Sequence, residues 1–113
     1  MADYILIESR DPFESAEVGN FLDLAEGLAR EGGLVTLFLV QNAVLAARHG
    51  AQANNSRVRS LTSLATCGVE VLADSFSLLE RGISATRLVA GVTVAPLSTV
   101  IHHMAAGRKA LWN

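Results

Sequence analysis

The segment Cys67-Gly-Val-Glu-Val-Leu-Ala-Asp74-Ser75 holds the residues of this 113-residue chain whose chemistry is easiest to define. Cys67 is the only cysteine, and its thiolate form could accept sulfur or attack a sulfur–sulfur bond. Asp74 and Ser75 follow a short apolar run, where a carboxylate or hydroxyl could cap a helix or contact a ligand. The segment therefore offers two possibilities, sulfur chemistry at Cys67 or a polar site around Asp74.

These two possible sites lie at opposite ends of one predicted strand. Residues 69–74 are mostly apolar and rich in valine, which is typical of a buried strand, and residues 75–82 predict one or two helical turns that end at Arg81-Gly82. At a rise of ~3.3 Å per residue, Cys67 and Asp74 lie ~20 Å apart, so we expect no shared site within one subunit. No lysine, arginine or histidine neighbours Cys67 in the sequence, which favours a small buried residue over a sulfur acceptor.

The elements that position these residues alternate regularly between strand and helix. Strands are predicted at 4–9, 34–40, 69–74, 86–94 and 108–113. Helices are predicted from an Asp11-Pro12 start to a Gly32-Gly33 stop, and at 41–50, 56–66, 75–82 and 96–107. Short connections between alternating elements predict an α/β fold, with a mostly parallel five-stranded sheet and helices on both faces. The length is that of a single domain covering residues 1–113.

The composition predicts self-association and excludes several kinds of partner. Half of the residues are apolar and only 18% are charged, which is more apolar surface than a small domain hides alone, so we expect subunit interfaces. A net charge of −2 predicts no binding to nucleic acid. We see no signal peptide and no apolar run long enough to span a bilayer, so we expect no membrane association and a cytoplasmic location.

A ligand of such a sheet is expected at the carboxyl ends of the strands. These ends supply the candidate binding residues Arg10, Asp11, Asn42, Asp74 and Ser75. Arg81, at the end of the predicted helix 75–82, is a further candidate, because it could face an anion across an interface. No glycine-rich nucleotide motif follows a strand, and adjacent His102 and His103 diverge on a helix rather than converge on a metal. We therefore predict no cofactor and no metal site.

Several segments in a fixed order resemble the DsrE/DsrF-like family of sulfur-relay proteins, which includes the TusD-type subunits. The resemblance rests on the strand, short helix and Arg-Gly-Ile of residues 68–83, and on three further segments: 9–29, 37–50 and 91–113. It implies a flavodoxin-like, doubly wound subunit that assembles into trimers or hexamers. It also implies that active members carry a persulfide on a strand-end cysteine and pass the sulfur to a partner.

This chain departs from the family pattern at that cysteine. Counting back from Arg81-Gly82, the cysteine position falls on Asp74, whose carboxylate cannot carry a persulfide but can cap a helix. Three functions stay open. The chain could be a structural or partner-binding subunit, assembling with itself, with a cysteine-bearing relative or with a sulfur-carrier protein. It could be a sulfurtransferase-like carrier using Cys67 as a catalytic thiol, or a small-ligand or nucleotide-binding module.

Overall fold

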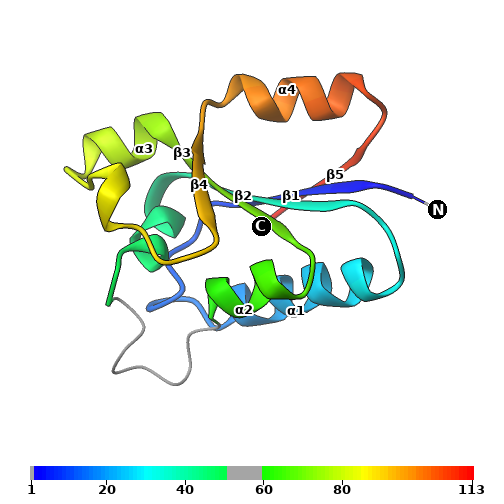
Figure 1. Ribbon diagram of the computed structural model, residues 1–113, viewed down its shortest axis with the longest axis horizontal. Helices are drawn as coiled ribbons and strands as arrows, with labels where there is room; N and C mark the ends of the chain where they lie inside the picture. The colour runs from blue at the N-terminus through cyan, green and yellow to red at the C-terminus, as the bar shows by residue number, and fades with distance from the viewer. Residues whose placement is uncertain (1, 51–59) are drawn as a thin grey trace.

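The computed structural model describes residues 2–50 and 60–113 and contains a five-stranded sheet in the order β4-β3-β2-β1-β5 (Figure 1). Every pair of neighbouring strands is parallel. The strands are shorter than predicted, but each lies inside or next to its predicted range: β1 Tyr4–Glu8, β2 Val35–Leu39, β3 Glu70–Asp74, β4 Val92–Ala95 and β5 Lys109–Trp112. The prediction of a five-stranded, parallel α/β fold is therefore confirmed.

The sheet is wound in both directions from its starting strand. The chain moves outward from β1 through β2 and β3 to β4, and then returns to place β5 on the opposite side of β1. This order differs from the 2-1-3-4-5 order of flavodoxin itself, although both sheets are doubly wound. Because all the strands are parallel, their carboxyl ends lie along one edge of the sheet, which is where ligands bind in such folds.

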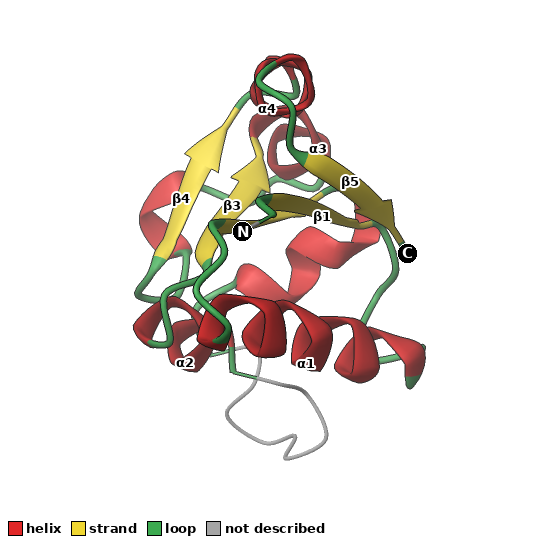
Figure 2. Cartoon of the chain, turned by 90° about the vertical axis from the view of Figure 1, so that its right-hand side faces the viewer, coloured by secondary structure: helices red, strands yellow, loops and turns green. Residues whose placement is uncertain are grey.

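Helices cover both faces of the sheet, as the sequence predicts, but they cover them unequally (Figures 1 and 2). One face packs against the helix α1 (Glu17–Arg30), the 3-10 helix η1 (Gln41–Ala47) and the helix α2 (Leu61–Thr66), and holds the larger apolar core. The other face is covered by α4 (Ser98–Ala105), which places only Val100 in a smaller core cluster. The helix α3 (Ser75–Glu80) and the 3-10 helix η2 (Ala85–Arg87) connect β3 to β4.

The first helix begins later than the Asp11-Pro12 pattern predicts. Asp11 instead closes an isolated turn: its side chain accepts from the Phe13 N–H at 2.9 Å, and its carbonyl accepts from the N–H groups of Glu14 and Ser15. This local turn satisfies the donors that a helix start would have needed, so α1 begins only at Glu17.

Three other elements also differ from the prediction in type or length. Residues 41–47 form a 3-10 helix, in which the Ala43 N–H donates to the Val40 carbonyl three residues before it. The helix predicted at 56–66 is α2 from Leu61 onward, and its predicted residues 56–59 lie outside the described residues. The segment 86–94 is divided between η2 and β4, with Gly91 at a φ of +95° just before the strand.

Within residues 2–50 and 60–113, no helix has the length and apolar character needed to cross a membrane.

Candidate functional site

Two cavities open at the carboxyl ends of the strands. The first, which we call the α3–α4 cavity, has a volume of about 320 Å3 and includes Asp74 and Ser77 in its lining. Its walls are apolar side chains from the sheet, α3, α4 and β5: Ile7, Val40, Phe76, Leu97, Val100 and Trp112. The second, which we call the polar cavity, has a volume of about 440 Å3 and is lined by polar residues that follow β1 and β2: Ser9, Arg10, Asp11, Glu14, Ser15, Gln41 and Asn42.

Asp74 is buried and caps α3. Its Oδ2 atom accepts from the Ser77 N–H at 3.0 Å and from the Ser77 hydroxyl at 2.6 Å, so the carboxylate holds the first turn of the helix through one oxygen. The Ser77 hydroxyl in turn accepts from the Gln41 N–H at 2.8 Å, which links the end of β3 to the end of β2. The sequence predicts the cap at Asp74, but the partners that fix the carboxylate come from packing.

The second oxygen of Asp74 has no partner among residues 2–50 and 60–113. Oδ1 is buried and accepts no hydrogen bond from any described residue of the chain. Leaving a buried acceptor unpaired costs about 1–3 kcal/mol, which is large beside the stability of a small domain. Asp74 also lines the α3–α4 cavity, so this residue combines a buried, unpaired acceptor with a position in the cavity wall.

Gln41 adds backbone strain to the same network. Its φ of +52° makes it the one described non-glycine residue in the left-handed region, a conformation that costs about 1–2 kcal/mol in a residue with a side chain. Gln41 lines both cavities, and its N–H is held by Ser77. Strain of this kind gathers at functional sites, so its position supports the carboxyl edge as the functional edge of the sheet.

The remaining candidate residues from the sequence do not join Asp74. Arg10 and Asp11 line the polar cavity, and Arg10 is paired with Glu17 at 2.7 Å. Asn42 also lines the polar cavity, where its Oδ1 accepts from Arg81 at 3.0 Å and 3.3 Å. Ser75 is exposed and lines neither cavity.

Arg81 ties α3 to η1 through that contact with Asn42. Its Nη1 atom also donates to the Ser77 carbonyl at 3.1 Å. These bonds engage the guanidinium group within the subunit.

Four residues of the cavity linings are absent from the candidates predicted from the sequence: Ser77, Gln41, Phe76 and Trp112. Of these, only Gln41 had a feature in the sequence that indicated a binding site, because it lies at the end of a predicted strand.

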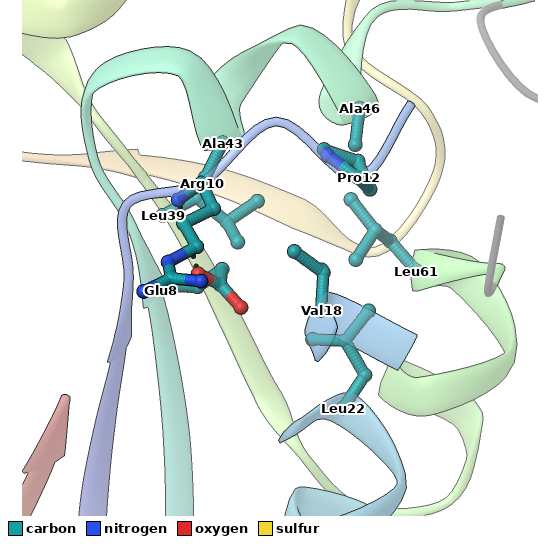
Figure 3. Close-up of a pocket in the computed structure, with 9 residues that line it drawn as sticks. All are labelled: Glu8, Arg10, Pro12, Val18, Leu22, Leu39, Ala43, Ala46 and Leu61. Carbon is teal, nitrogen blue, oxygen red and sulfur yellow. Dashed lines mark hydrogen bonds between the residues drawn. The ribbon is translucent and has the colours of Figure 1, made fainter. Parts of the chain in front are cut away.

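A third, much smaller cavity lies beside the buried carboxylate of Glu8 (Figure 3). The Glu8 side chain is 0% exposed, and its two oxygens accept from the Arg10 N–H at 3.0 Å and the Asn113 side-chain amide at 2.9 Å. Opposite Glu8 and Arg10 in Figure 3 lie apolar side chains of the core, including Val18 and Leu22. At about 10 Å3 this cavity has room for a single water molecule and no larger ligand.

Cys67 lies outside these cavities, at the C-terminal end of α2 and before β3. The structure brings Arg30 within 3.8 Å of its sulfur atom, while the thiol donates to Glu26 at 3.6 Å. The sequence alone did not indicate these two contacts, because they join residues 37 and 41 positions apart. Cys67 is partly buried and is paired within the fold.

A polar cluster occupies the other end of the sheet, below α4. The buried Thr36 hydroxyl donates to Glu70 at 2.8 Å and accepts from Arg108 at 2.7 Å, and His103 Nε2 lies 3.9 Å from Glu70. Burial lowers the pKa of His103, the Arg108 charge lowers it further, Glu70 opposes the shift, and His102 adds to it. The net effect is a lowered pKa for His103, which favours the neutral form of its imidazole ring.

This shift predicts a small pH dependence of stability. Because the pKa of His103 is lower in the folded protein than the ordinary 6.5, the unfolded chain binds more protons as the pH falls below that value. The contribution of His103 to the free energy of unfolding should therefore be complete above pH 6.5. It should decrease as the pH falls through the lowered pKa of the folded protein. Urea unfolding between about pH 8 and about pH 5 measures this, and His103→Gln should show a shallower loss. An identical pH profile in the variant would contradict the assignment.

Exposed apolar side chains concentrate on α3, α4 and β5. Seven of the ten large apolar side chains exposed among the described residues come from these three elements, and we call them the α3–α4–β5 surface: Phe76, Leu79, Leu97, Ile101, Met104, Leu111 and Trp112. All four residues of β5 are exposed, and β5 is an edge strand. A surface of this kind marks an interaction site, because monomeric proteins rarely expose apolar side chains in such density.

The described residues contain no group of three or more histidine, cysteine, aspartate or glutamate side chains placed to hold a metal ion. His102 and His103, which the sequence predicts to diverge, are among the residues that this search covered. The chemistry offered by the strand ends is therefore that of carboxylate, hydroxyl and amide groups beside an apolar cavity.

Comparisons with solved structures agree on one fold. The ychN protein from E. coli has a solved structure with a TM-score of 0.87 and 24% sequence identity, covering 100% of both chains. MTH1491 from Methanobacterium thermoautotrophicum has a TM-score of 0.78 and 16% identity, covering 98% of this chain and 100% of that one. BT1422 from Bacteroides thetaiotaomicron has a TM-score of 0.66 and 16% identity, covering 96% and 94%.

These solved structures share the fold, and at such low identities they establish the fold alone. Among curated proteins, none matches the sequence. A protein-family model, however, matches residues 2–112, which is nearly the whole chain. The protein therefore belongs to the DsrE/DsrF-like family.

Proposed function

We propose that this chain is a small oligomeric subunit associated with an intracellular sulfur relay, in which it serves as a structural or partner-binding member without a sulfur-carrying cysteine. The observation that carries the proposal is Asp74. The family resemblance assigns the cysteine to this position, and here a buried carboxylate uses one oxygen to cap α3. A carboxylate forms no persulfide, so a sulfur atom in the relay must be carried by another chain.

The proposed assembly uses the α3–α4–β5 surface. Its apolar side chains are exposed in the subunit, and burying them against other subunits is favourable by roughly 25 cal/mol per Å2 of apolar area. We propose a trimer or hexamer of this chain, or a mixed oligomer with a cysteine-bearing relative, with a sulfur-carrier protein as a further partner. The proposal also includes a single domain over residues 1–113, a cytoplasmic location and no conventional enzymatic activity.

The proposal predicts that the protein does not accumulate a persulfide. After treatment with polysulfide, intact mass spectrometry should show no stable adduct of one sulfur atom, because Asp74 cannot hold one and Cys67 is partly buried and paired with Glu26. Cys67→Ser provides the control, since it removes the only thiol. A stable adduct in the wild type that disappears in Cys67→Ser would overturn the proposal.

A second candidate function is sulfur transfer by Cys67. The observation that favours it is the guanidinium of Arg30 at 3.8 Å from the sulfur atom, since a nearby cation stabilises a thiolate. Glu26 acts in the opposite sense, because its carboxylate lies 3.6 Å from the same atom. The polysulfide experiment separates the two functions, and Arg30→Gln would decrease any adduct that forms.

A further inference from the structure

We propose that the α3–α4 cavity binds a small organic cation, namely a protonated amine carried on an aromatic or branched aliphatic body. The inference goes beyond the proposed function, because it concerns the ligand of the cavity and does not depend on a sulfur relay. Phe76, Leu97 and Trp112 line the cavity and also belong to the α3–α4–β5 surface, so in the proposed oligomer the cavity would lie at the subunit interface. The inference rests on the free oxygen of Asp74, the charges around the cavity and the composition of its walls.

The polar contact of the site is the Oδ1 atom of Asp74. Asp74 is 5% exposed, and both hydrogen bonds that its side chain accepts from described residues fall on Oδ2. The Ser77 hydroxyl cannot turn to serve Oδ1, because it donates to Oδ2 and accepts from the Gln41 N–H. Oδ1 is thus held in place as a buried acceptor that lacks a donor among the described residues. A ligand N–H in the cavity that Asp74 lines would pair with it by displacing the side chains that cover it.

The charges around the cavity favour a cation. Asp74 and Glu80 both line it, and the described lining residues include no lysine, arginine or histidine. Arg81 lies 3.7 Å from Glu80 but is already engaged by Asn42 and the Ser77 carbonyl. Arg81 supplies a counter-charge to Glu80, so an anionic ligand would meet Asp74 as the lining carboxylate with no cation among its described contacts. A neutral apolar ligand would leave Oδ1 unpaired.

The walls require the cation to be organic. Phe76 and Trp112 contribute aromatic rings, whose faces attract cations, while Leu97 and Val100 offer aliphatic contact. An inorganic ion would use none of these surfaces. The volume of about 320 Å3 lies at the small end of the usual range for ligand pockets, which suits a small molecule better than a peptide.

The position of Trp112 makes the proposal directly testable. It is the only tryptophan in the chain and lines the cavity, so its fluorescence reports binding at this site. The probe is 2-phenylethylammonium, and 2-phenylethanol serves as a neutral analogue of nearly the same shape. We expect a saturable change with the amine and at least about tenfold weaker binding of the alcohol, which lacks the charge.

Two variants separate a specific site from general apolar binding. Asp74→Asn can keep the cap through its amide oxygen but replaces the free acceptor with N–H donors, so amine binding should weaken about 10- to 100-fold. Phe76→Leu keeps an apolar wall and removes the ring, so binding should weaken by about 3- to 10-fold. Glu31→Gln is the control, because it removes one carboxylate from an exposed site at the end of α1.

Four results would overturn the proposal. The first three are the absence of a saturable change with the amine, equal binding of the amine and the alcohol, and unchanged amine binding by folded Asp74→Asn. The fourth is a change of oligomeric state in Asp74→Asn without any amine response in the wild type. That outcome would assign the carboxylate to a basic side chain of a neighbouring subunit instead of a small molecule.

Discussion

Asp74→Cys in a Cys67→Ser background is expected to convert a chain that takes up no sulfur into one that carries a persulfide at position 74. The position ends β3, begins α3 and lies beside the α3–α4 cavity, through which a small sulfur donor can approach. The Ser77 N–H that now donates to Asp74 would face the introduced sulfur, and a donor at a helix start favours the thiolate. Under the proposed function, we therefore expect the surroundings of position 74 to support a sulfur-carrying thiol.

The reaction in this experiment is a simple exchange. The introduced thiolate attacks a terminal sulfur atom of an inorganic polysulfide and forms a new sulfur–sulfur bond. The adjacent bond in the polysulfide breaks, and the shortened polysulfide leaves with the electron pair of that bond. No external oxidant is needed, because the polysulfide already holds sulfur in the oxidised form that is transferred.

Intact mass spectrometry after polysulfide treatment measures the gain. Cys67→Ser alone should take up no sulfur, and Asp74→Ser in the same background should behave likewise while keeping a residue that caps helices well. Thermal unfolding should show that Asp74→Cys costs about 1 kcal/mol, the usual cost of losing a cap, and leaves the fold intact. If the folded double variant gains no sulfur, the end of β3 is not a sulfur-carrying site, and the proposal that Asp74 occupies the cysteine position of the family is wrong.

Ile101→Glu is expected to have the second largest effect, by converting an oligomer into a monomer. Ile101 lies on α4 and is 63% exposed in the subunit, on the α3–α4–β5 surface and outside the lining of the α3–α4 cavity. Burying a glutamate in an apolar interface costs several kcal/mol, and the isoleucine contribution of about 2 kcal/mol is also lost. Association should therefore weaken by a factor of about 100 or more.

Sedimentation velocity at micromolar concentration measures this change. The wild type should sediment with three or six times the 12.0 kDa mass of the chain, and Ile101→Glu with the mass of one chain. Leu24→Glu is the matched control, because Leu24 is also exposed, at 43%, but lies on α1 across the sheet from α4. A monomeric wild type would contradict the proposed assembly. If Ile101→Glu and Leu24→Glu both converted the oligomer into monomers, the interface would have to include residues outside the α3–α4–β5 surface.

The fold class could be predicted from the sequence because its signals are local. The run Val35–Leu39 is buried throughout, and a strand covered on both faces shows this property directly as continuous apolar sequence. The helical spacing of Val18, Leu22 and Ala25 likewise gives the buried face of α1. The predicted helix start at Asp11 was wrong for a reason that is also local. The same residues that can cap a helix can close a turn, and here Asp11 closes a turn.

The candidate site could be predicted only in outline. The rule that ligands bind at strand ends selects Asp74, Asn42 and Arg10, but it does not say which of them share a cavity. The structure separates Asp74 from the other two, because Asp74 lines the α3–α4 cavity whereas Asn42 and Arg10 line the polar cavity. It also replaces Ser75 with Ser77 as the partner of the carboxylate, because the helix start turns residue 77 back toward position 74.

The sequence by itself determined the α/β class, the family and the presence of an aspartate where a cysteine is expected, since each depends on residue types in a fixed order along the chain. Only the tertiary structure decided what that aspartate does. Its state depends on contacts between elements distant in sequence, such as the Gln41–Ser77 bond across 36 residues. Such contacts follow from how helices pack on the sheet. Packing leaves Oδ1 of Asp74 without a partner among the described residues, and it brings Asp74 and Trp112 into the lining of one cavity.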